Sequence, residues 1–119
     1  MEKVIPLIPI RDGVIFPNTD SVLTFGRPKS LAALDSSFAH ERAVCFVLQK
    51  NPKLNDPSPS DLYSVGTLSR IERMVKTDGE INAQVRGITR VKIVSVEELE
   101  TFLLARVIET PDIADNSPE

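Results

Sequence analysis

The sequence has few of the residues that carry catalysis, metal binding or covalent cross-links. Its 119 residues include one Cys, one His, one Tyr and no Trp. A single cysteine excludes an intramolecular disulfide scaffold, and Cys45 stands in the apolar run AVCFVL, so we expect a buried free thiol. His40 has no companion ligands at metal-binding spacing, and we therefore expect no metal site and no histidine base.

Long hydrophobic runs and an excess of basic charge are also missing. No apolar run approaches the roughly 18 residues of a membrane-spanning helix, and no secretory signal begins the chain. The net charge of -3 gives no broad attraction for phosphate backbones. We therefore expect a soluble, cytoplasmic protein whose partners include neither nucleic acid nor membrane.

Motifs of known catalytic chemistry do not occur either. The sequence contains no GxxxxGK[ST] phosphate loop, no HExxH, no GxSxG and no CxxC. Carboxylates are plentiful, but none is paired in a context that indicates tuned acidity. We expect no catalytic residue and no cofactor within these 119 residues.

What the sequence does contain is a long β-hairpin pattern, from residue 61 to 93. Asp78 and Gly79 mark its turn, because glycine reaches positive φ without a steric penalty. A two-residue loop would set Glu72 opposite Val85, a charged residue against an apolar one. A three-residue loop, 77–79, sets Ile71 opposite Val85 instead, and we favour it. This register points Met74 outward and places five residues inward: Ile71, Val75, Ile81, Ala83 and Val85.

The remaining segments predict one helix and further strands. Pro28 suits a first helical turn, and Leu31, Leu34 and Phe38 follow at helical spacing. Residues 43–49 are apolar on both faces and predict a central strand. Residues 4–17 contain three prolines, which predicts an edge or interrupted strand. Gly87 predicts a bend, residues 51–61 a surface loop, and 101–109 a last strand.

The chain therefore reads as one β domain followed by a short tail. Residues 110–119, TPDIADNSPE, are polar and contain two prolines, so they predict a linker toward domains further along a longer chain. We assign the domain to residues 1–109. Its class is mainly β with one helix (α+β), as a compact twisted sheet of about six strands.

Several segments, in order, resemble the amino-terminal domain of the Lon family, the ATP-dependent proteases also called protease La. They are PLIPIRDGVIFPN at 6–18, GRPKS at 26–30, QKNP at 49–52, DLYSVGTLSRI at 61–71 and GITRVKI at 87–93. The resemblance implies a PUA-like pseudobarrel carrying a single helix. Arg11, Asp12, Gly66 and Gly87 match the family and are expected to be structural, as is Gly79 of the hairpin turn.

The resemblance also implies a role without catalysis in this part of the chain. In the family this domain recognises unfolded or damaged protein substrates and helps to assemble a homo-oligomeric ring, a hexamer. A helical lobe, an AAA+ ATPase that uses ATP and Mg, and a protease with a Ser-Lys dyad follow it. Two alternatives remain open: a free-standing adaptor or scaffold with the same fold, and an RNA-binding pseudobarrel using Arg70, Arg73, Arg86, Arg90 and Lys92.

Recognition of unfolded chains requires exposed apolar side chains on a stable frame, because folded and unfolded proteins differ mainly in the apolar surface they show. Phe16, Leu23 and Tyr63 have an alternative interpretation as core residues. The candidate substrate-contact residues are Phe16, Pro17, Val22, Leu23, Tyr63, Leu68 and Met74.

Overall fold

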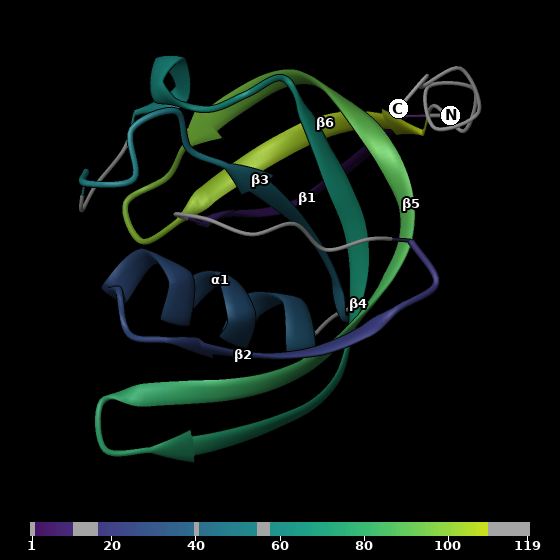
Figure 1. Cartoon of the computed structure of the whole chain (residues 1–119). Coiled ribbons are helices and arrows are strands. Elements are labelled where there is room, and N and C mark those ends of the chain that lie inside the picture. The colour runs from purple at the N-terminus through teal and green to yellow at the C-terminus, as the bar shows by residue number, and fades with distance from the viewer. Residues whose placement is uncertain (1, 11–16, 40, 55–57, 110–119) are drawn as a thin grey trace.

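The computed structural model describes residues 2–10, 17–39, 41–54 and 58–109 (Figure 1). The expected tail, 110–119, lies outside these residues. The described part confirms a mainly β domain with one α-helix and six strands. The elements are β1 (Glu2–Ile10), β2 (Asp20–Phe25), α1 (Pro28–Ala39), β3 (Ala43–Leu48), the short 3₁₀ helix η1 (Pro59–Asp61), β4 (Val65–Thr77), β5 (Glu80–Glu98) and β6 (Leu103–Glu109).

The six strands form one sheet that closes on itself. Their order is β2-β5-β4-β3-β1-β6, and β6 pairs again with β5. Closure is possible because β5 has 19 residues: its first half pairs with β2 and β4, and its second half pairs with β6. β5 therefore curves around the molecule (Figure 1). The pseudobarrel expected from the sequence is confirmed.

The core has two parts, separated by β3. Val44 and Phe46 point toward α1, where Phe46 stacks on Phe25 with ring centroids 5.8 Å apart. Cys45 and Val47 point into the pseudobarrel. This alternation confirms the prediction of a central strand covered on both faces. Cys45 is a free, buried thiol, as expected.

Helix α1 begins at Pro28 and packs its apolar side on the sheet, as its sequence spacing predicts. Leu34 is fully buried, and Leu31 and Phe38 pack against the same cluster. On the exposed side, the Asp35 carboxylate lies 3.0 Å from Lys76 Nζ in β4. His40 lies outside the described residues. No described helix has the length and apolar content needed to cross a membrane.

Strand β1 is neither an outermost strand of the sheet nor interrupted by a bulge in residues 2–10, which corrects the expectation drawn from its prolines. It lies between β3 and β6. Its first half, residues 2–7, pairs with β6, and its second half, 7–10, pairs with β3, so each half has one partner. The Pro9 carbonyl accepts a hydrogen bond from Arg27 Nη2 at 3.0 Å and faces away from β3. The missing N–H of Pro9 therefore costs no ladder bond.

The hairpin turn also differs from the prediction. Its loop has two residues, Asp78 and Gly79, so Thr77 pairs with Glu80 and Lys76 with Ile81. A β-bulge between Ile71 and Arg73 inserts Glu72, and beyond it Ile71 pairs with Val85 as expected. The two registers are therefore not exclusive, because the bulge allows one near the turn and the other beyond Glu72.

The bulge reverses the predicted orientation of two neighbouring side chains. Met74 faces inward, lies opposite Ala83 and packs against the core cluster below α1. Val75 faces outward and is 57% exposed. The predictions of an outward Met74 and an inward Val75 are therefore wrong, whereas Ile71, Ile81, Ala83 and Val85 are buried as predicted.

Three glycines expected to be structural lie in the described residues. Gly79 has φ of +72°, which agrees with its place in the turn. Gly66 lies so close to β3 that a Cβ atom at this position would be 2.6 Å from the Phe46 carbonyl oxygen. Gly87 does not break its strand, because β5 continues through it with an irregularity at Ile88. Arg11 and Asp12 lie outside the described residues.

Candidate peptide-binding surface

The residues expected to contact substrate do not form one surface. Leu68 is 2% exposed and lies inside the pseudobarrel, so its proposed contact role is wrong. Leu23 and Met74 are partly buried and pack against the core below α1. Their positions follow from pairing with β5, since Leu23 and Met74 both lie opposite Ala83 on the inner face.

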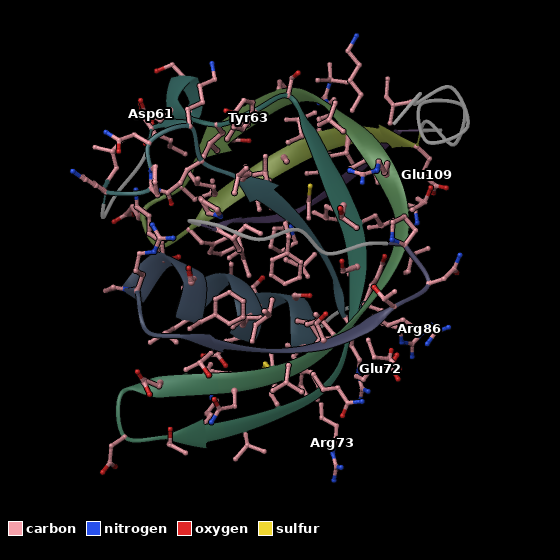
Figure 2. All side chains as sticks on the ribbon, viewed as in Figure 1. Asp61, Tyr63, Glu72, Arg73, Arg86 and Glu109 are labelled. Atoms are coloured by element: carbon pink, nitrogen blue, oxygen red, sulfur yellow. The ribbon has the colours of Figure 1, made fainter. Side chains whose placement is uncertain are left out.

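The other candidates are separated along the molecule. Val22 in β2 is 71% exposed, and Tyr63, after η1, is 48% exposed. Figure 2 shows Tyr63 at the opposite end of the molecule from Arg73 of the hairpin. Pro17 is half-buried and forms a bridge to Gly87, whereas Phe16 lies outside the described residues.

An open surface is formed where β2, β5 and β4 lie side by side. We call it the outer face, because its side chains point away from the core cluster packed under α1. The β5 residues Gln84 and Asn82 occupy its centre and separate the two exposed valines. Thr24 Oγ1 donates to Asn82 Oδ1 at 2.6 Å. The outer face consists of Val22, Gln84 and Arg73 in one row and Thr24, Asn82 and Val75 in the next.

Charged residues border the outer face in pairs of opposite sign. Arg86 Nη1 lies 3.1 Å from Asp20 Oδ1, and Arg70 Nε lies 3.9 Å from Glu72 Oε2. Two of the five cations considered for RNA binding are thus next to carboxylates. This pairing weakens the local positive field that a phosphate backbone would require.

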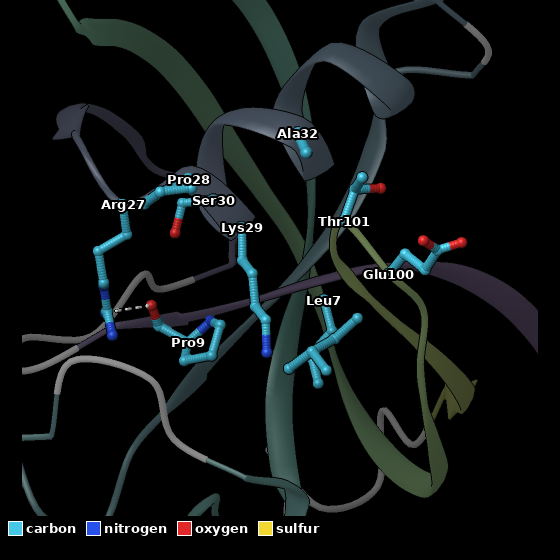
Figure 3. Close-up of a pocket in the computed structure, with 10 residues that line it drawn as sticks. Leu7, Pro9, Arg27, Pro28, Lys29, Ser30, Ala32, Glu100 and Thr101 are labelled. Atoms are coloured by element: carbon cyan, nitrogen blue, oxygen red, sulfur yellow. Dashed lines mark hydrogen bonds between the residues drawn. The ribbon is translucent and has the colours of Figure 1, made fainter.

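Two pockets lie where α1 begins. The larger, about 590 Å³, is lined by the apolar residues Leu7, Pro28 and Leu103 and by the charged residues Lys29 and Glu100 (Figure 3). The smaller, about 390 Å³, shares Pro9, Arg27 and Ser30 with it and extends along the end of β2. No local sequence pattern indicates either pocket, because each combines residues that lie far apart in the sequence.

The described residues contain little that suggests reaction chemistry. Among them, no three His, Cys, Asp or Glu residues are grouped as metal ligands would be. Burial raises the pKa of the Cys45 thiol to about 12, so it is protonated and a poor nucleophile at neutral pH. Hydrogen bonds from Ser58 lower the pKa of the exposed Asp61 carboxyl, at the start of η1. That carboxylate therefore acts as a local structural acceptor.

Comparison with known proteins shows which family this chain belongs to. The model described as the ATP-dependent protease La (LON) substrate-binding domain matches residues 4–119. The chain belongs to this Lon domain family. It is 36% identical over 120 residues to Lon protease 2 of Desulfotalea psychrophila, a match that covers 100% of this chain and 16% of that protein. It is 42% identical over 88 residues to Lon protease of Endomicrobium trichonymphae, covering 73% of this chain and 11% of that protein.

Solved Lon structures share the fold. The N-terminal domain of the Mycobacterium avium complex Lon protease superposes with a TM-score of 0.71 at 22% identity, covering 92% of this chain and 55% of that one. The Lon N-terminal domain protein from Xanthomonas campestris gives 0.68 at 19% identity, covering 92% and 62%. The chain thus corresponds to a Lon N-terminal domain, and it spans only 11% to 16% of the curated Lon proteases named above.

Proposed function

We propose that this chain is the non-catalytic module with which a Lon protease recognises unfolded or damaged proteins, and that the outer face is its contact surface. The observation that supports this most directly is the exposure of Val22 and Val75, which are 71% and 57% exposed. Both lie on a three-stranded surface whose opposite side packs against the core cluster that includes α1. Apolar side chains held out by a stable frame are what an unfolded polypeptide can bury.

The expected binding is weak and tolerant of sequence. Complete burial of one valine contributes roughly 1.5–3 kcal/mol, so two exposed valines support only a modest affinity. Asn82 and Gln84 between them offer amide donors and acceptors to a passing backbone. Weak contacts suit a module that must release its substrate to a protease. ATP hydrolysis with Mg, peptide-bond cleavage and hexamer formation are proposed for the rest of a longer Lon chain.

The test is binding of a permanently unfolded, fluorescently labelled polypeptide, followed by anisotropy. Val22→Glu and Val75→Glu place charge on the outer face and are expected to raise the Kd several-fold while the Tm stays near that of the unchanged chain. Val94→Glu is the matched control, because Val94 is 47% exposed but lies beyond the outer face, in the second half of β5.

Two results would contradict the proposal. Equal binding of folded and unfolded probes by the unchanged chain would remove selectivity for unfolded protein. An equal loss of binding in Val94→Glu and Val22→Glu would place the contact elsewhere. The adaptor alternative uses the same surface, and reading the gene beyond the codon for Glu119 distinguishes it: a phosphate-loop sequence there supports the protease.

A further inference from the structure

Strand β2 has a partner on one side only. It pairs with β5 through all six of its residues, and no other described strand pairs with it. An unpaired strand edge presents a row of main-chain donors and acceptors that another extended chain can use. Figure 1 shows β2 along the lower part of the molecule, between α1 and the hairpin of β4 and β5.

The direction of each β2 main-chain group follows from the hydrogen bonds that Gly87 makes with the residues just before β2. Gly87 N–H donates to the Thr19 carbonyl at 2.9 Å, and the Gly87 carbonyl accepts from Asn18 N–H at 2.7 Å, so Gly87 faces β2. Main-chain groups alternate sides along a strand, so Val85, Ala83 and Ile81 also face β2. Their partners Ser21, Leu23 and Phe25 bond to β5, whereas the alternate residues Val22 and Thr24 direct N–H and C=O to the open edge.

The open edge of β2 lacks the features that usually block such edges. β2 contains no proline, no lysine and no bulge. A second open edge, β4 beyond Ile71, has the Glu72 bulge and a lysine in register with the inner face, Lys76, whose Nζ lies 3.0 Å from Asp35 Oδ1 on α1. Bulges and inward charges prevent edge pairing. Of these two edges, β2 is therefore the less protected against pairing.

A pocket adjoins the same edge. The pocket of about 390 Å³ is lined by residues 23–26, by the end of β1 and by the start of α1. No β5 residue lines it, so it lies on the side of β2 away from β5. A strand added along β2 would place one of its alternate side chains at this pocket.

We propose that the open edge of β2 binds an extended segment of unfolded polypeptide as an additional strand, with one side chain entering the adjacent pocket. This proposal rests on the proposed function and states how the unfolded polypeptide binds. Main-chain hydrogen bonds do not depend on sequence, which suits clients that share only an exposed backbone. A second copy of this chain fits the edge less well. A six-residue strand is about 20 Å long. Pairing of two copies along it would bury much less than the roughly 1,200 Å² of a stable interface.

The test separates the backbone of Val22 from its side chain. Val22→Pro removes an N–H that faces the open edge and leaves the bonds between β2 and β5 intact. Val22→Thr retains the N–H and a β-branched side chain. For a permanently unfolded probe, we expect Val22→Pro to raise the Kd by roughly 3- to 10-fold, the effect of one lost hydrogen bond, and Val22→Thr to raise it less.

Hydrogen exchange on the unchanged chain gives a readout that needs no variant. The amides of Val22 and Thr24 are expected to exchange more slowly when the probe is present, while that of Leu23, already bonded to β5, changes little. Unaltered exchange at Val22 and Thr24, or equal binding by Val22→Pro and the unchanged chain, would overturn the edge proposal. In that case, probe binding by the unchanged chain would still support the proposed function.

Two further outcomes are distinguishable. If the unchanged chain binds no unfolded probe, the proposed function itself fails, and the edge proposal fails with it. If sedimentation shows a dimer that Val22→Pro converts to a monomer, the edge serves pairing of two copies, and the proposal of a client strand is overturned.

Discussion

Gly66 in β4 lies so close to Phe46 in β3 that the two strands can pair as they do only if position 66 has no side chain. A Cβ atom on Gly66 would be 2.6 Å from the Phe46 carbonyl oxygen and 2.8 Å from Cys45 Sγ. Gly66→Ala therefore has to displace main chain in the middle of the sheet. We expect it to lower the free energy of unfolding by about 1–3 kcal/mol, measured by urea denaturation.

Gly26→Ala is the control for this prediction. A Cβ atom there would meet only the Glu80 side chain, at 3.8 Å, which is ordinary contact. Its unfolding free energy should stay within about 0.5 kcal/mol of the unchanged chain. Equal effects of the two substitutions would mean that the packing of β4 on β3 is looser than described.

Met74 and Val75 are neighbours that face opposite sides of the hairpin. Met74→Asp would place a charge against the core cluster below α1 and is expected to destabilise the domain by about 2 kcal/mol or more. Val75→Asp alters a side chain that is 57% exposed and should cost less than about 1 kcal/mol, mainly in β-propensity. Thermal unfolding of the two variants measures the difference. The reverse order of stability would indicate a hairpin without the bulge at Glu72.

Cys45 should be unreactive while the domain is folded. Burial keeps the thiol neutral and raises its pKa from the ordinary value of 9.0 to about 12. A thiol reagent at pH 8 should label it at least 100-fold more slowly than in denaturant, because labelling requires opening of the core. Labelling at the denatured rate would contradict the buried position of Cys45.

The same thiol gives stability a dependence on alkaline pH. The folded state favours the protonated form, so this contribution is fully present below pH 9.0 and is lost as the pH rises toward about 12. Cys45→Ala has no thiol to ionise, and its stability should fall less over that range. Parallel denaturation curves at pH 8 and pH 10.5 measure the difference, and an equal decline in both proteins would exclude this cause.

Local patterns were sufficient to predict the helix and the central strand. Pro28 and the spacing of Leu34 and Phe38 specify α1 without reference to the rest of the chain, and the run around Cys45 is apolar on both faces because two core clusters cover it. The edge position predicted for β1 failed for a different reason. β1 changes partner half-way along its length, from β6 to β3. Proline lacks an N–H, but at Pro9 this group would face away from β3, so no hydrogen bond between the strands is lost.

The candidate site depended on the hairpin register, which the sequence alone did not settle. Ile71 pairs with Val85 as predicted, but one extra residue, Glu72, shifts the pairing on the turn side and exchanges the orientations of Met74 and Val75. Val22 was correctly chosen as an exposed apolar residue, whereas Leu68 was not, because the closure of the sheet covers it. Its contribution to substrate binding stays a prediction. The pockets beside α1 join residues distant in sequence, and no local pattern indicates them.

The most direct measurement is cross-linking of this chain to a permanently unfolded polypeptide that carries photoreactive groups, followed by mapping of the attachment sites. We predict attachment to β2 and to the outer face of the β4 and β5 hairpin, near Val22 and Val75, and competition by unlabelled unfolded protein. Attachment concentrated around Tyr63 and Val94, or no attachment that unfolded competitor removes, would contradict it.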